Sequence, residues 1–139
     1  MKLAYRDIEP FVKAPNKAAR IILVYGPDDG LMRERAKTMG LSVVKDYADP
    51  FNVAALSTAM LLDDPARLAD EANAISMMGG DRLIRVEDAS DKLTPLIKEY
   101  LTNPSPHALV ILEAGELGTK SSLRALCEKA QNAAAVPCY

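Results

Sequence analysis

The sequence predicts an α/β fold in which helices flank a parallel sheet of five strands. Short apolar runs rich in Ile, Leu and Val alternate along the chain with amphipathic segments of helical period. Strands that are apolar throughout are buried on both faces, and helices on both sides of a parallel sheet provide that burial. The length of 139 residues corresponds to a single domain.

The predicted strands are the runs with the most aliphatic and β-branched residues. The first is closed by Gly26, and the run that starts at Ala108 is the most apolar of all. The second run is the weakest. The five predicted strands are residues 21–25, 42–45, 83–86, 108–112 and 133–137.

The predicted helices are placed by capping residues and stop signals. Gly40 stops the first of them. Asp49–Pro50 and Asp64–Pro65 each place an N-cap before a proline at the first helical position, and the second of these helices ends at Gly79–Gly80. Thr119 is expected to cap the last helix. The five predicted helices cover about residues 31–39, 49–62, 64–78, 91–102 and 119–130.

The composition is that of an ordinary globular domain, with 49% hydrophobic and 26% charged residues. No apolar stretch reaches the roughly 18 residues of a membrane helix, and the first residues contain no apolar signal core, so no membrane partner and a cytoplasmic location are expected. The formal net charge of −2, without a basic run, indicates that the main partner is not nucleic acid. Because the sequence stops at a predicted strand, we expect it to be a fragment of a longer protein.

The residues that could bind a metal are few and scattered. The chain has one histidine, His107, and two cysteines, Cys127 and Cys138, at no metal-ligand spacing. His107 is interpreted as a surface residue. The two cysteines are interpreted as buried thiols, because free cysteine is among the most buried residue types. No metal site is expected.

A phosphate-binding loop is expected where a strand, a glycine turn and a helix N-terminus follow one another. The turn here runs from Gly26 to Gly30, one residue shorter than the P-loop motif. A working P-loop has Lys and then Ser or Thr after the second glycine, to reach the phosphates and to hold magnesium. Leu31 and Met32 occupy those positions, so no nucleotide cofactor is expected.

The acidic residues near this loop are interpreted as structural. Asp28 and Asp29 can cap the free N–H groups of the helix and place negative charge where a phosphate would bind. A nucleotide or metal site remains the alternative at this stage. Glu87, Asp88 and Glu113 follow predicted strands, where magnesium-binding acids often lie, but they are interpreted as solvated loop residues. No catalytic residue is therefore assigned.

Two adjacent methionines close the helix that begins after Asp64. On a helical wheel Leu68, Ala72 and Ile75 form the buried stripe, Met77 points nearly opposite to it, and Met78 lies on a flank. One interpretation is that Met78 packs under the following strand and that Met77 is incidental. The other is that the pair forms an adaptable apolar knob that inserts into a pocket of another protein.

Two segments resemble the N-terminal domain of the delta subunits of bacterial DNA polymerase III clamp loaders. They are residues 21–34, IILVYGPDDGLMRE, and residues 71–86, EANAISMMGGDRLIRV, and the similarity extends over nearly the whole chain. The resemblance implies a three-layer, P-loop/AAA+-like fold without a working P-loop. It also implies that lid and collar domains follow this domain in the family and are absent from this chain.

The resemblance further implies a clamp-binding site. In the family a Ser-Leu-Phe element at the end of a helix inserts into the hydrophobic cleft of the sliding clamp and helps to open the ring. The corresponding residues here are Ser76, Met77 and Met78, followed by Gly79, and Asn73 stands where related clamp-binding peptides often have glutamine. Methionine thus replaces both Leu and Phe. The implied partners are the sliding clamp and the gamma/tau and delta prime subunits, with DNA contacted only within the full assembly and ATP hydrolysed by other subunits.

Two other functions compete with this one. The first is an unusual P-loop nucleotidase, which the missing Lys and Ser/Thr disfavour. The second is a phosphoryl-receiver signalling domain, with Asp28 and Asp29 as its acidic pair and Asp88 as the phosphorylated residue. A receiver also has a lysine after its last strand, and the chain ends before that position.

Overall fold

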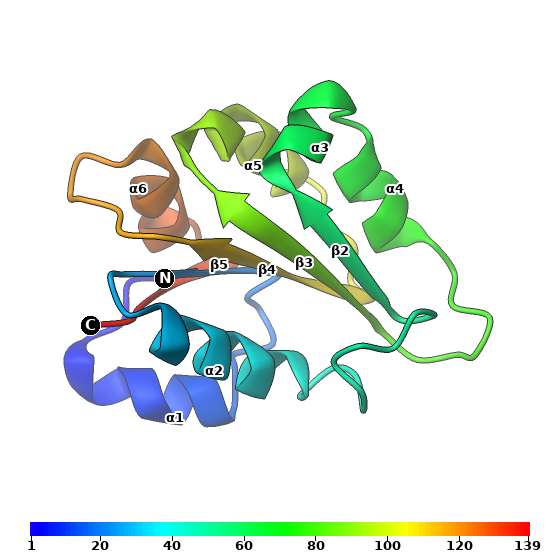
Figure 1. Ribbon diagram of the computed structural model, residues 1–139, viewed down its shortest axis with the longest axis horizontal. Helices are drawn as coiled ribbons and strands as arrows, with labels where there is room; N and C mark the ends of the chain where they lie inside the picture. The colour runs from blue at the N-terminus through cyan, green and yellow to red at the C-terminus, as the bar shows by residue number, and fades with distance from the viewer.

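The computed structural model describes all of residues 1–139, and its centre is a parallel sheet with the strand order β2-β3-β4-β1-β5 (Figure 1). The predicted fold class is confirmed. The strands are β1 (Ile21–Tyr25), β2 (Val53–Ser57), β3 (Arg82–Ala89), β4 (Ala108–Ala114) and β5 (Ala133–Pro137). The helices are η1 (Tyr5–Asp7), α1 (Ile8–Lys13), α2 (Asp29–Gly40), α3 (Thr58–Asp63), α4 (Arg67–Asn73), η2 (Asp91–Leu93), α5 (Thr94–Tyr100) and α6 (Ser122–Lys129).

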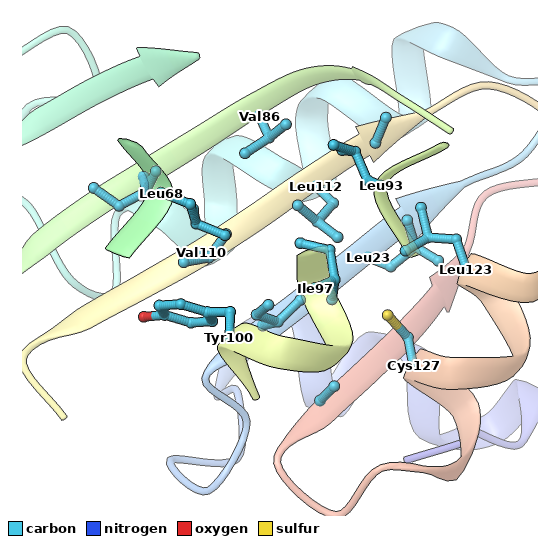
Figure 2. Close-up of a cluster of buried hydrophobic side chains, with 14 of the residues drawn as sticks. Leu23, Leu68, Val86, Leu93, Ile97, Tyr100, Val110, Leu112, Leu123 and Cys127 are labelled. Atoms are coloured by element: carbon cyan, nitrogen blue, oxygen red, sulfur yellow. The ribbon is translucent and has the colours of Figure 1, made fainter. Parts of the chain in front are cut away.

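The sheet separates two apolar cores. Alternate residues of a strand point to opposite faces, so in β1 Leu23 packs on one side and Val24 on the other. Helices α1 and α2 cover the face of Val24, and helices α3 to α6 cover the face of Leu23. On the face of Leu23, the side chains of Leu68, Ile97 and Leu123 project from α4, α5 and α6 onto the sheet (Figure 2). No helix is long and apolar enough to cross a membrane.

The second predicted strand and the helix predicted after it are wrong. Residues 42–45 form an irregular segment with turns after α2. Val44 is nevertheless buried in the core between the sheet and helices α1 and α2. The edge strand is β2, and only its continuation α3 is helical. Asp49 does not cap a helix, because its carboxylate accepts a hydrogen bond from Phe51 N at 2.8 Å in a local turn. The alanine-rich strand β2 buries only Leu56 fully, so its sequence carries little strand signal.

The remaining differences are one unpredicted helix and the ends of the predicted helices. Helix α1 was not predicted. The N-cap of α6 is Ser121 rather than Thr119, and its hydroxyl accepts from Arg124 N at 3.2 Å. Cys127 on that helix is buried as predicted, and burial raises the pKa of its thiol to about 12. Cys138 is buried as well.

Asp91 joins the start of α6 to η2 and gives a pH-dependent prediction. Its Oδ1 accepts from Ser121 Oγ at 2.6 Å and from Leu123 N at 3.1 Å, and these bonds lower the pKa of Asp91 below its usual value. A carboxyl with a lowered folded-state pKa stabilises the fold above its unfolded pKa, and this contribution is lost as pH falls through the folded pKa. We therefore expect Asp91→Asn to lower the melting temperature at neutral pH and to matter progressively less below about pH 4.

Thermal melts of both proteins across that pH range test the prediction. Glu116→Gln, on an exposed loop, is the matched control and should leave the melting temperature nearly unchanged at every pH. An Asp91→Asn effect that is the same at acidic and neutral pH would contradict the role of the carboxylate charge.

Candidate functional site

The β1–α2 turn is closed by the structure around it. Gly26 has φ of 140°, and a Cβ added there would lie 2.2 Å from the carbonyl oxygen of Cys138, so only glycine fits. Asp28 is the N-cap of α2, with its Oδ1 accepting from Leu31 N at 3.0 Å, and its own N–H donates to Cys138 O at 3.3 Å. The prediction that Asp28 caps this helix is confirmed. Asp29 is the exposed first residue of α2, and Gly30 follows it.

A polar cavity of about 520 Å³ lies beside this turn, on the α2 face of the sheet. Arg85 of β3 is one of the residues that line it. The Arg85 guanidinium carbon lies 4.3 Å from the centroid of the Tyr47 ring, and its Nη2 lies 3.5 Å from Glu113 Oε2 and 3.7 Å from Glu87 Oε1. The cavity is lined by Asp29, Met32, Arg33, Lys37, Tyr47, Arg85, Glu87, Asp88, Glu113, Ala114 and Gly115.

Glu113 differs from its predicted role as a solvated loop residue. It lies within β4 and is buried, and burial raises the pKa of its carboxyl while the nearby Arg85 acts in the opposite direction. Glu87 and Asp88 are exposed, as predicted, but they lie within β3 rather than in a loop after it. Asp88 has φ of 54° at an irregularity between β3 and β4. The sequence analysis missed Arg85 and Tyr47, since a cation on a central strand is visible only once its partners are placed.

The cavity is poorly suited to a nucleotide. Arg33 and Lys37, one turn apart on α2, could attract an anion, but four carboxylates line the same space. Nowhere in the chain do three or more His, Cys, Asp or Glu side chains form a group that could hold a metal. His107 lies far out on the surface with 82% of its side chain exposed, and its Nδ1 is 3.9 Å from Asp81 Oδ1.

The receiver-domain hypothesis is wrong. Receivers have the strand order 2-1-3-4-5, in which the first two strands are neighbours. Here β1 lies between β4 and β5, and β2 is at the edge of the sheet beside β3. Asp28 and Asp88 therefore do not belong to a receiver site.

The methionine pair lies in a loop rather than at the end of a helix. Helix α4 ends at Asn73, and Ala74 is extended with ψ of 138°. The exposed fractions are 93% for Ile75, 92% for Met77 and 72% for Met78. Met77 is solvent-exposed as predicted. Ile75 was expected in the buried stripe with Leu68 and Ala72, and this is wrong because the helical wheel no longer applies beyond α4.

We call residues 74–80 the apolar loop. It projects from the edge of the molecule between α4 and β3, at the amino ends of the strands, whereas the β1–α2 turn lies at their carboxyl ends (Figure 1). Gly79 N donates to Ser76 O at 3.2 Å and closes a turn around the methionines. Met78 is exposed, so it does not pack under β3. The two candidate sites are therefore at opposite ends of the sheet.

Residues distant in sequence hold the apolar loop in place. Asn52, the residue before β2, accepts a hydrogen bond from the Ser76 hydroxyl and donates through Nδ2 to Gly79 O at 3.4 Å. Asn73 instead donates to Ala69 O of its own helix at 2.8 Å. Sequence reasoning missed Asn52, because it fell within a segment predicted as helix.

Arg82 fixes the base of the apolar loop. Its side chain is buried and donates through Nε to Glu71 O at 2.8 Å, through Nη1 to Phe51 O at 2.8 Å and through Nη2 to Glu71 Oε2 at 2.9 Å. These bonds tie the end of α4, the segment before β2 and the first residue of β3 together. The loop is therefore anchored on both sides while its apolar side chains stay in solvent.

The class that the fold and the turn define is a three-layer α/β domain with the strand order β2-β3-β4-β1-β5, whose β1–α2 turn lacks the P-loop lysine and hydroxyl. Among solved structures the chain is similar to a DNA clamp loader delta protein of Bacillus subtilis, with a TM-score of 0.69 and 22% identity over 96% of this chain and 42% of that one. It is also similar to a DNA polymerase III gamma subunit-related protein of Thermotoga maritima, with a TM-score of 0.62 and 14% identity over 96% of this chain and 45% of that one.

These similarities confirm the fold expected from the resemblance to clamp-loader subunits. No family model and no curated protein matches the sequence. The chain spans less than half the length of either solved structure.

Proposed function

We propose that this chain is the clamp-binding domain of a clamp-loader delta subunit, which binds a DNA sliding clamp and helps to open it without hydrolysing ATP. The observation that carries the proposal is the apolar loop, with three large apolar side chains in solvent on a base fixed by Arg82. Such a group of exposed apolar side chains is typical of a protein-binding site. The fold shared with a clamp loader delta protein supports the choice of partner.

The apolar loop has the chemistry that a hydrophobic cleft requires. Met77 and Met78 have flexible, polarisable side chains that fit irregular apolar cavities. Each large apolar side chain moved from water into a cleft contributes about 1.5–3 kcal/mol. Ser76 and Gly79 shape the turn from which they project, and the exposed Asn73 lies at its rim. In this proposal Ile75, which the sequence analysis placed in the core, is a third apolar contact.

The other parts of the proposed function follow from the same assignment. The gamma/tau and delta prime subunits are the proposed partners within the loader, and DNA is contacted only in the assembly. The net charge of −2 is consistent with weak DNA binding by this chain alone. ATP hydrolysis is assigned to other subunits because the β1–α2 turn lacks the P-loop lysine and hydroxyl.

Binding to the clamp is the decisive experiment. The purified chain is titrated onto the immobilised sliding clamp of the same organism, and saturable binding that is blocked by a soluble clamp-binding peptide is expected. Competition by the peptide identifies the hydrophobic cleft as the site. Absence of saturable binding at high micromolar concentrations would contradict the proposal.

We also expect the chain to bind no MgATP at millimolar nucleotide, because carboxylates and a helix cap occupy the phosphate position. Isothermal calorimetry with MgATP should show only heats of dilution, and the same protein batch should bind the clamp as a control for its integrity. A saturable signal with micromolar affinity would restore the nucleotidase hypothesis.

A further inference from the structure

The apolar loop is connected to the sheet by a short relay of hydrogen bonds that starts at Asn52. The Asn52 carboxamide oxygen accepts from the Ser76 hydroxyl, and the same hydroxyl oxygen accepts from Met78 N at 3.3 Å. The Asn52 amide nitrogen donates to Gly79 O at 3.4 Å. The side chain of Asn52, directly before β2, thus contacts both sides of the turn that carries Met77.

Little else fixes the conformation of this turn. Gly79 and Gly80 have φ of 73° and 84°, and a Cβ added at either residue would meet no atom within 4 Å. The exposed side chains of Ile75 and Met77 make no core contacts that could order the backbone. Two successive glycines with open surroundings give a chain that many conformations can satisfy. The bonds from Asn52 are therefore the main long-range restraint on the turn.

We propose that Asn52 is the positioning residue of the apolar loop: it holds the turn in the conformation that binds the clamp. This inference rests on the proposed function. Asn52 acts through Ser76 and Gly79 and does not itself touch the clamp. A loop that is only fractionally in its binding-competent conformation binds with an affinity reduced by that fraction. The fixed turn thus removes an ordering cost from the binding step.

The chemistry of the carboxamide explains why this residue is suited to the role. Asparagine supplies an acceptor for Ser76 and a donor for Gly79 from one planar group. Aspartate keeps the acceptor and loses the donor, and alanine loses both. Because the carboxylate of aspartate also places an acceptor oxygen against Gly79 O, both Asn52→Asp and Asn52→Ala are expected to bind the clamp more weakly than the wild type. The loss in Asn52→Ala should be roughly tenfold, since one partly buried and one exposed hydrogen bond are removed.

The test measures clamp affinity, loop order and stability in the same set of variants. Asn52→Ala should lower affinity, should narrow the ¹³C-methyl signals of Met77 and Met78 as the loop gains fast motion, and should leave the melting temperature nearly unchanged. Asn132→Ala is the matched control: it removes an Asn Nδ2 bond to Leu101 O of 3.0 Å far from the loop, and it should leave clamp affinity unchanged even if stability falls.

A double-mutant comparison separates positioning from direct contact. If Asn52 acts through the apolar loop, Asn52→Ala should have almost no further effect in a chain that already carries Ile75→Ala, Met77→Ala and Met78→Ala. A full tenfold effect in that background, or wild-type affinity in Asn52→Ala, would overturn the positioning role while leaving the proposed function intact. Failure of the wild-type chain to bind the clamp would overturn both the proposed function and the positioning role of Asn52. This outcome differs from the others because it appears in the wild type, without any substitution.

Discussion

Replacing Met77 and Met78 together by alanine is expected to abolish most of the binding to the sliding clamp. Their exposed fractions are 92% and 72%, so the fold does not use these side chains. Losing two apolar contacts at roughly 1.5–3 kcal/mol each corresponds to a weakening of about 100-fold or more. The melting temperature should stay within about a degree of the wild type, as for other surface substitutions. Surface plasmon resonance and thermal melts measure the two quantities.

Tyr5→Ala is the matched control for this experiment. Tyr5 is 93% exposed and lies in η1, away from the apolar loop. It should leave clamp affinity unchanged, which shows that loss of exposed apolar surface alone is not sufficient. Ile75→Ala should weaken binding by a smaller factor, as a single contact. Unchanged affinity in the double methionine variant would show that the clamp binds elsewhere on the domain.

Replacing Arg82 by alanine is expected to be the most destabilising polar substitution in the chain. The change removes the donor to Phe51 O, leaves Glu71 O with only its bond from Ala74 N at 3.3 Å, and breaks the ion pair with Glu71 Oε2, in a partly buried region. An acceptor left without its donor costs about 1–3 kcal/mol, and together with the lost ion pair and the weakened bonding of Glu71 O a total loss of roughly 2–4 kcal/mol is expected. Urea unfolding measures it as a shift of the midpoint at constant slope.

Arg20→Ala provides the comparison for Arg82. The Arg20 guanidinium also donates to a backbone carbonyl, Pro106 O at 2.9 Å, but this bond is exposed to solvent. Water can replace it, so a loss below about 1 kcal/mol is expected. If both arginine variants lose the same free energy of unfolding, the Arg82 hydrogen bonds that join α4, the segment before β2 and β3 do not stabilise the fold as we describe.

The strongest elements of the fold could be predicted because their signals are local. Residues 21–25 are apolar throughout and were predicted as a strand with the bounds that β1 has. Residues 108–112 lie within β4, and all of that strand is buried. Strand β2 was missed because it lies at the edge of the sheet and pairs only with β3, so its sequence Val53–Ser57 is half-exposed and rich in alanine. Its strand conformation comes from pairing with β3 rather than from propensity.

The end of α4, at the candidate site, was also mispredicted because a contact distant in sequence decides it. In a continued helix Glu71 O would accept from Ile75 N. Here Glu71 O accepts from Ala74 N at 3.3 Å and from Arg82 Nε at 2.8 Å. The Arg82 side chain, eleven residues further along the chain, thus donates the hydrogen bond that the next helical turn would have supplied to Glu71 O. The helix therefore ends here. The wheel that placed Ile75 in the core could not include this contact.

The sequence by itself determined the fold class and the absence of P-loop residues from the β1–α2 turn. Both depend on which side chains are present at short spacing: apolar runs between amphipathic segments, and Leu31 and Met32 in place of lysine and a hydroxyl. The tertiary structure alone decided how the methionines are presented, because Asn52 and Arg82 hold the apolar loop through bonds across 11 to 31 residues of sequence. Such bonds form only when the sheet has brought the segments together, and no local pattern encodes them.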